Sequence, residues 1–155
     1  MNYNVDINLD EKTLLAIGEK ILSAQPFSIF LGTKILSFKL GKVMLETPIK
    51  KEYLQQNGFA HGGLISYAAD NALTFAGGSV LGLEVLTLEF KINFLRPATG
   101  VKILAIAEVV YSSKRHAACR CDIYSVGENN DRKLCAAAQG SILLMNAQND
   151  SNGTS

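Results

Sequence analysis

The chain has 155 residues, 48% of them hydrophobic, which is enough for a single domain that buries one core. Fifteen basic residues nearly balance fourteen acidic ones, and the formal net charge of +1 does not favour a nucleic-acid partner. The first six residues lack the basic and apolar segments of a signal peptide, so a cytoplasmic location is expected. These properties leave a small molecule as the expected ligand.

The cysteines do not suggest a metal site. Cys119, Cys121 and Cys135 are odd in number, lie in strand-like apolar segments, and lack a Cys-x-x-Cys pair or a second nearby histidine. We therefore expect buried, reduced thiols and no bound metal. Residues 64–83 are weakly charged and long enough to span a bilayer, but Asp70 and several hydroxyl side chains argue against a membrane span.

The N-terminal part predicts a helix followed by two strands. Asn8 or Asp10 can cap the helix, and Pro26 marks its end. Its apolar positions fall on one stripe at helical spacing: Leu14, Leu15, Ile21 and Leu22. Residues 27–40 and 42–49 are rich in β-branched and aromatic side chains, which predicts strands on either side of a hairpin turn at Gly41 and Lys42. Pro48 closes the second strand.

Residues 62–78 are apolar on all sides, which predicts a central helix enclosed by other elements. Four strands are expected after it, at residues 85–95, 102–112, 117–126 and 134–145, as a consecutive antiparallel meander. The first of them alternates, with one face made of Leu86, Leu88, Phe90, Ile92 and Phe94. A period of two places Thr87 on the opposite face, unless a bulge or a partner chain intervenes.

This order of elements predicts an α+β fold in which an antiparallel sheet wraps around one central helix. We expect a single domain over residues 1–145, with residues 1–26 as a helical extension and residues 146–155 as a disordered tail. Exposed edge strands and the remaining apolar surface have to be covered, and self-association is the simplest solution. At least a homodimer is expected.

The candidate chemistry lies at the start and in the middle of the predicted central helix. Gly62 and Gly63 can bring bare backbone N–H groups close to a ligand oxygen, at the positive end of the helix dipole. Asp70 is the only acidic residue between Glu52 and Glu84. A carboxylate in an apolar segment costs roughly several kcal/mol unless it is paired or used, so a general base, a nucleophile and a structural ion partner are its possible roles.

The segment Asn57-Gly58-Phe59-Ala60-His61-Gly62-Gly63 is followed by Ala69-Asp70-Asn71, then by Thr87, and then by Leu95-Arg96-Pro97-Ala98. With an aspartate nine residues after the histidine, this pattern resembles the hotdog-fold thioesterases of the phenylacetic-acid-pathway (PaaI) type over residues 27–145. The resemblance implies a hotdog fold, hydrolysis of an acyl-coenzyme A thioester without metal or cofactor, and a dimer or dimer of dimers.

By position, the resemblance assigns Gly62 as the backbone donor to the thioester carbonyl, Asp70 as base or nucleophile, and Thr87 as the hydroxyl that orients water. Relatives often have an asparagine six residues before the histidine, where this chain has Gln55. The other expected substrate contacts are Gln55, Asn57, His61 and Gly63 in the loop, and the basic Lys91, Arg96, Lys114 and Arg115, which are candidates for the coenzyme A phosphates.

The spacing of Gly62 and Asp70 adds a constraint of its own. Eight residues of straight helix separate them by about 12 Å along the axis, so both cannot reach one thioester carbon. An oxyanion donor and a base at one reacting group must then come from different chains. We expect Gly62 of one subunit to face Asp70 of its partner.

Two other functions use the same fold. A non-catalytic acyl-thioester sensor would have no need of a carboxylate at Asp70. A dehydratase would need a catalytic histidine beside an acid, and only His61 and His116 are available. A catalytic serine triad is not indicated, because the sequence lacks the Gly-x-Ser-x-Gly pattern around a serine nucleophile. Hydrolysis of an acyl-coenzyme A thioester is therefore the leading interpretation.

Overall fold

A computed structural model describes residues 9–145 of the chain. Its elements, in chain order, are α1 (Glu11–Ser23), α2 (Pro26–Leu31), β1 (Lys34–Lys39), β2 (Lys42–Pro48), the 3-10 turn η1 (Lys51–Tyr53), α3 (Gly62–Leu81), β3 (Val85–Phe94), β4 (Lys102–Ser112), β5 (His116–Val126) and β6 (Arg132–Leu144). The predicted tail at 146–155 and the candidate cap Asn8 lie outside the described residues.

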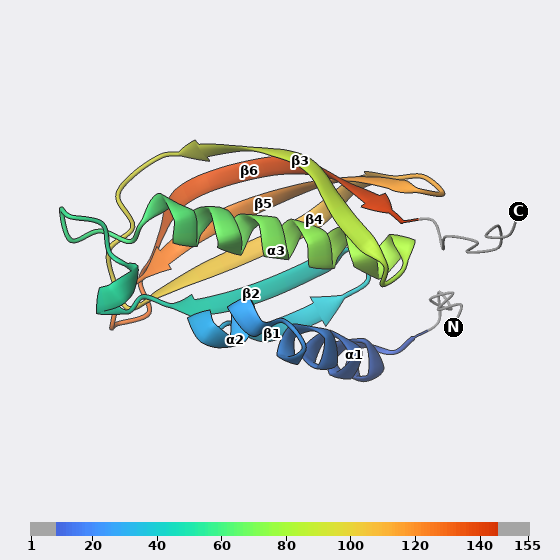
Figure 1. Cartoon of the computed structure of the whole chain (residues 1–155), viewed down its shortest axis with the longest axis horizontal. Coiled ribbons are helices and arrows are strands. Elements are labelled where there is room, and N and C mark those ends of the chain that lie inside the picture. Colours follow the sequence, from blue (N-terminus) through green and yellow to red (C-terminus); the bar gives the residue numbers. More distant parts are fainter. Residues whose placement is uncertain (1–8, 146–155) are drawn as a thin grey trace, which may run out of the picture.

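The strands form one six-stranded antiparallel sheet in the order β1-β2-β4-β5-β6-β3. The long helix α3 lies across one face of this curved sheet and packs against β2, β3, β4, β5 and β6 (Figure 1). The shorter helices α1 and α2 lie beside the β1–β2 end of the sheet, where α1 packs on β1 (Figure 1). The predicted α+β arrangement, a sheet wrapped around a central helix, is confirmed.

Small residues let α3 lie close to the sheet. The side of the helix that faces the strands carries buried Ala68, Ala69, Ala72, Ala76 and Gly77. A Cβ atom on Gly77 would lie 2.7 Å from Cβ of Ile142 on β6, closer than two carbon atoms approach without strain. The absence of a side chain at this position therefore sets the distance between α3 and β6.

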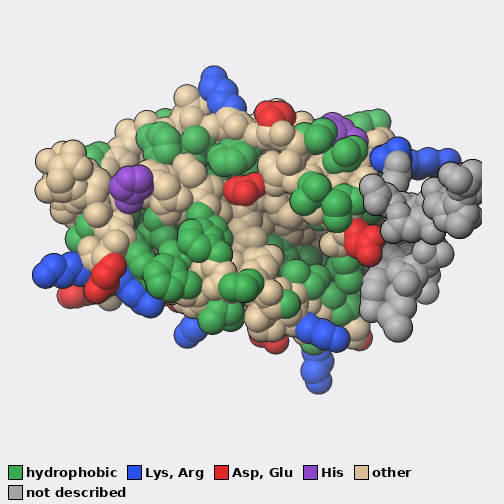
Figure 2. Space-filling model, viewed as in Figure 1, with side chains coloured by type: hydrophobic (Ala, Val, Ile, Leu, Met, Phe, Trp, Pro, Cys, Tyr) green, Lys and Arg blue, Asp and Glu red, His purple; other side chains and the backbone are tan. Residues whose placement is uncertain are grey.

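The prediction that α3 is apolar on all sides is wrong. Half-buried polar side chains at helical spacing form one stripe along the helix, made of Ser66, Tyr67, Asp70, Asn71 and Thr74. They share a face because residues three and four positions apart are neighbours on a helix. The abundant alanines and glycines of the segment hide this stripe in the sequence. Figure 2 shows the corresponding face of the molecule, where hydrophobic side chains gather on both sides of the helix.

The N-terminal helix is confirmed, but the strand expected from residue 27 begins later. Asp10 Oδ1 accepts a hydrogen bond of 2.7 Å from Thr13 N and caps α1. Residues 26–31 then form α2, with Pro26 at its first position and Gly32 ending it at a φ of +79°. Proline at the start and a left-handed glycine at the end stabilise a short helix in spite of aromatic and β-branched residues between them.

The remaining strands are confirmed to within a few residues, whereas their predicted order is not. The hairpin between β1 and β2 turns at Leu40 and Gly41, and Pro48 ends β2 as predicted. Only β4, β5 and β6 form a meander. β3 pairs with β6 at one edge of the sheet, and β4 pairs with β2. Local patterns predict each strand, but they do not say which of two distant strands will be its neighbour.

An irregularity in β3 changes the direction of its first side chains. Thr87 pairs with Ile142 and Glu89 with Ser141, so Leu88 is an extra residue without a partner in β6. Leu86 and Leu88 are 57% and 58% exposed, whereas Phe90 and Ile92 pack against the core. The predicted single face from Leu86 to Phe94 is therefore wrong in its first half, because the bulge reverses the alternation.

The three cysteines are buried, free thiols, as expected. Burial raises the pKa of Cys119 to about 11, so this thiol is protonated and unreactive near neutral pH. In residues 9–145 no group of His, Cys, Asp and Glu side chains could hold a metal ion. None of the helices in this range is long and apolar enough to cross a membrane.

The close packing of α3 on β6 predicts that Gly77→Ala destabilises the protein. Alanine improves helix propensity by roughly 1 kcal/mol, but overpacking against the branched carbon of Ile142 costs about 1–3 kcal/mol. We expect the free energy of unfolding, measured by urea denaturation, to fall by about 1 kcal/mol. Ser66→Ala, on the outward side of the same helix, serves as the control and should cause no loss. A Gly77→Ala protein more stable than the parent would contradict this account.

Candidate active site

Asp70 lies in the middle of α3 and is hydrogen-bonded to Thr87 on β3. Thr87 Oγ1 donates to Asp70 Oδ1 at 2.6 Å. Thr74 Oγ1 lies 2.9 Å from Thr87 Oγ1 and donates to the backbone oxygen of Asp70 at 2.8 Å. The carboxylate is half-buried rather than fully enclosed, so it is both held in position and open to a ligand. The bulge at Leu88 brings Thr87 to this side of the sheet.

The N-terminus of α3 presents a free backbone donor. His61 is the N-cap, and its Nδ1 accepts a hydrogen bond of 2.8 Å from Gly63 N. In the described part of the chain, Gly62 N has no acceptor. Because this N–H lies at the positive end of the helix dipole, it can donate to an oxygen of a bound molecule. His61 thus accepts the N–H of Gly63, and the N–H of Gly62 remains available to a ligand oxygen.

Two other predicted site residues lie beside Gly62. An open cavity of about 360 Å³ is lined by Gln55 from the preceding loop, Gly62, and Arg96 from the end of β3. Gln55 Oε1 accepts a hydrogen bond of 2.5 Å from Asn57 N, so its side chain is tied to the turn of its own loop. The side chain of Asn57 is exposed and is not part of the cavity wall.

The other predicted phosphate contacts are not brought together in one chain. Lys91 lines a groove on the outer face of the sheet, away from α3, with Glu89 and Arg120 as neighbours. Lys114 and Arg115 lie in the β4–β5 turn, where the backbone oxygen of Arg115 accepts from Leu144 N at the end of β6. Arg96 N instead donates to Cys135 O, near the start of that strand. Arg96 and the turn residues are therefore at opposite ends of β6.

Gly62 and Asp70 are both in α3 and are separated by about 12 Å along its axis. A single chain consequently places the free N–H and the carboxylate at two different positions along one face. The predicted pair of Asp70 and Thr87 does meet in one chain. Thr74, which the sequence analysis missed, joins that pair. Its position one helical turn after Asp70 is the signal that could have revealed it.

A second polar cluster lies on the other side of the stripe. Tyr67 Oη donates to Ser28 Oγ at 2.6 Å or to Thr33 Oγ1 at 2.9 Å, and Asn71 Nδ2 donates to Tyr67 Oη at 3.2 Å. Ser28 Oγ in turn donates to Gln25 Oε1 at 2.6 Å. Ser28 and Thr33 are buried, so these hydrogen bonds replace contacts with water. The cluster connects α3 to α2, a helix that was absent from the sequence prediction.

Comparison with known proteins places this geometry in context. Residues 57–130 match the family model of the thioesterase superfamily. The chain is 34% identical over 88 residues to a "Putative esterase" of Saccharolobus solfataricus, and the match covers 56% of this chain and 63% of that protein. The chain thus spans less than two thirds of this relative's length.

Two solved structures extend the similarity to almost the whole described fold. A thioesterase family protein from Silicibacter pomeroyi is 31% identical, with a TM-score of 0.77 over 82% of this chain and 95% of that chain. A mutant of the phenylacetic acid degradation protein PaaI from Thermus thermophilus is 27% identical, with a TM-score of 0.68 over 78% and 100%. These similarities confirm the predicted resemblance and the hotdog fold. They support hydrolysis of a thioester or ester bond in general.

The cluster around Tyr67 predicts that Tyr67→Phe destabilises the protein. The substitution keeps the ring, which contacts Phe27 edge to face, but removes the hydroxyl that joins Asn71 to Ser28. Leaving these groups with fewer partners costs about 1–3 kcal/mol, measurable as a lower free energy of unfolding. Tyr111→Phe, at a side chain 64% exposed, is the control and should change stability by less than about 0.5 kcal/mol. Equal effects of the two substitutions would contradict a structural role of the cluster.

Proposed function

Because this chain belongs to the thioesterase superfamily, we propose that it hydrolyses an acyl-coenzyme A thioester to a free acid and coenzyme A. The observation that carries the proposal is the 2.6 Å hydrogen bond between Thr87 and Asp70 on the outward stripe of α3. If Asp70 served only to complete a buried hydrogen-bond network, its carboxylate would be expected to be fully buried, whereas it is half-exposed. A carboxylate that is oriented by a hydroxyl and open to a ligand is suited to act on a substrate.

In the proposed reaction, the Gly62 N–H and the dipole of α3 stabilise the negative charge that develops on the thioester carbonyl oxygen. Asp70 acts in one of two ways. As a general base it takes a proton from water, and the hydroxide adds to the carbonyl carbon. As a nucleophile it forms a mixed anhydride that water then hydrolyses. In both cases the carbon–sulfur bond breaks, coenzyme A leaves as the thiolate and takes up a proton, and Thr87 orients the water or the carboxylate.

We propose that two chains share each site. Only a second copy can bring a Gly62 N–H to the carboxylate of Asp70, since the two groups of one chain are about 12 Å apart on the same helix. β3 is an edge strand of ten residues, and its exposed Leu86 and Leu88 would lose contact with water against a partner. A homodimer, alone or as half of a dimer of dimers, satisfies both requirements.

The shared site also determines which of the two chains would supply each proposed substrate contact. Gln55 and Arg96 lie beside Gly62 in one cavity and would contact coenzyme A from that chain, together with the loop residues Asn57, His61 and Gly63. Lys114 and Arg115 lie near the far end of β6. Lys114 and Arg115 can therefore contact the phosphates of a coenzyme A bound beside Gly62 only when they come from the partner chain. Lys91, on the outer face of the sheet, is the weakest of the proposed contacts.

The role of Asp70 predicts that Asp70→Asn lowers kcat by about two to four decades, because an amide neither accepts the proton nor attacks the carbonyl. Release of free thiol from a panel of aryl- and fatty acyl-coenzyme A esters measures the effect. Asp122→Asn, on the outer face of the sheet, is the matched control and should retain the parent rate. If the parent binds these esters tightly without releasing thiol, the protein is a sensor and the proposal is wrong.

The shared site predicts complementation between two inactive variants. Gly62→Pro removes the N–H at the first helical position, where proline is tolerated, and should lower kcat by about 10²–10³. Gly62→Ala keeps the N–H, and its Cβ would lie 3.5 Å from Phe94, so this control should stay active. After subunit exchange between equal amounts of Gly62→Pro and Asp70→Asn proteins, half the dimers are mixed and each has one intact site. About a quarter of the parent activity should return. If no activity returns although mixed dimers form, each site belongs to one chain.

A further inference from the structure

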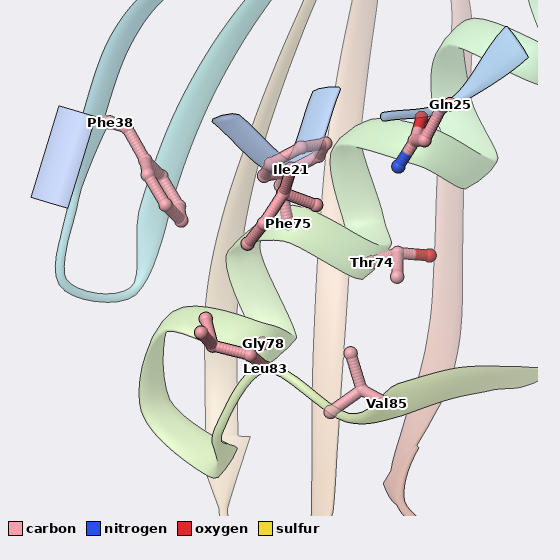
Figure 3. A pocket seen from close by; sticks show the side chains of 8 residues that line it. All are labelled: Ile21, Gln25, Phe38, Thr74, Phe75, Gly78, Leu83 and Val85. Atoms are coloured by element: carbon pink, nitrogen blue, oxygen red, sulfur yellow. The ribbon is translucent and has the colours of Figure 1, made fainter. Parts of the chain in front are cut away.

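A small apolar pocket lies beside the Asp70–Thr87 pair, between the end of α1 and the start of β3 (Figure 3). Its volume is about 120 Å³. The lining residues come from α1, the α1–α2 connection, β1, α3, the α3–β3 connection and β3: Ile21, Gln25, Phe38, Thr74, Phe75, Gly78, Leu83 and Val85. Among these lining residues, Thr74 and Gln25 are the ones with polar side chains.

The pocket adjoins the proposed reaction centre through Thr74. Thr74, which forms part of its wall, lies 2.9 Å from the Thr87 hydroxyl that donates to Asp70. Thr74 and Gly78 follow Asp70 by four and eight residues along α3, about 6 Å and 12 Å further along the helix axis. Val85 is two residues before Thr87 and shares its face of β3. An acyl group whose carbonyl carbon lies at Asp70 can therefore extend into this pocket.

The size of the pocket limits what it can hold. An engineered protein cavity of about 150 Å³ binds benzene, so a pocket of about 120 Å³ accepts a chain of a few carbons or a small ring. Phe38 and Phe75 are both buried and pack edge to face, with ring centroids 5.5 Å apart. Close-packed aromatic rings do not move aside at small cost. A long fatty acyl chain consequently exceeds the volume of this pocket.

Gln25 gives this pocket a hydrogen-bond donor. Its Oε1 accepts from Ser28 Oγ at 2.6 Å, and Ser28 Oγ accepts from Tyr67 Oη at 2.6 Å. This chain of hydrogen bonds fixes the amide so that Nε2 is its free end. Figure 3 shows the Gln25 nitrogen directed from the α1–α2 junction toward the side of the pocket where Thr74 lies. Within residues 9–145, Nε2 has no hydrogen-bond acceptor.

We propose that Gln25 selects the acyl group, by donating from Nε2 to a carbonyl oxygen carried on a short acyl chain. The preferred substrates are then short oxo-acyl thioesters rather than plain hydrocarbon chains of equal length. A donor that faces an apolar wall loses contact with water when a hydrocarbon chain binds, whereas an oxo group restores its hydrogen bond. The inference rests on the proposed thioester hydrolysis and adds the substrate class.

The test compares hexanoyl-coenzyme A with its 4-oxo and 5-oxo derivatives, which have the same chain length. The parent should favour at least one oxo ester in kcat/KM by roughly three- to tenfold, the range provided by one neutral hydrogen bond. Gln25→Glu keeps an acceptor for Ser28 but replaces the donor, so it should abolish or reverse this preference. Gln25→Met, of similar length, should abolish it as well and serves if the glutamate variant does not fold. Gln139→Glu, on the outer face of the sheet, should keep the parent preference.

Calorimetric binding of the same three esters to the Asp70→Asn protein separates this inference from the proposed function, because it needs no turnover. Preferential binding of an oxo ester, lost with Gln25→Met, supports the pocket even if the parent never releases thiol. Turnover without preference, or a preference unchanged by both Gln25 substitutions, overturns the inference and leaves the hydrolase intact.

Discussion

The packing of α3 against the sheet is the constraint on which the rest of the structure depends. The free N–H of Gly62, the carboxylate of Asp70 and the part of the small pocket formed by Gly78 all belong to this helix, and Thr87 contacts it. Alanines and Gly77 on the inward side let the backbone approach β6 closely. That approach fixes the height of Asp70 above the sheet and with it the 2.6 Å hydrogen bond to Thr87. A helix displaced by about 1 Å would lose such geometry.

The bulge in β3 reconciles two demands on one strand. Thr87 must face α3 to reach Asp70, and Phe90 must face the same side to fill the core. Three positions separate them, and a regular strand with a period of two would put them on opposite faces. The extra residue Leu88 restores agreement at the expense of exposing its own side chain. Leu86 is exposed for the same reason, so the positioning of the threonine and the apolar edge of the sheet have one cause.

Much of this organisation could be predicted from the sequence, because it is encoded locally. The capped first helix, the glycine-initiated central helix and the strands that end at Pro48 and begin at Lys102 follow from caps, periodicity and turn residues. The neighbour of β3 could not be predicted, since pairing with β6 depends on contacts between distant segments. The helix at 26–31 was missed because strand propensity of its aromatic residues was weighted above the proline and glycine that bound it.

The polar stripe of α3 shows why the site itself was only half predictable. Asp70 stands out in the sequence as an isolated charge and Thr87 through the family resemblance, but Thr74 and Tyr67 do not, because their positions in an alanine-rich helix do not reveal what they contact. The structure divides the stripe into two clusters, one that holds Asp70 and one that joins α3 to α2 through Tyr67. Gln25 is the residue that belongs to both the second cluster and the pocket wall. In the proposed enzyme, the hydrogen bonds that attach α2 to the fold therefore also fix the Gln25 amide that would donate to the acyl group.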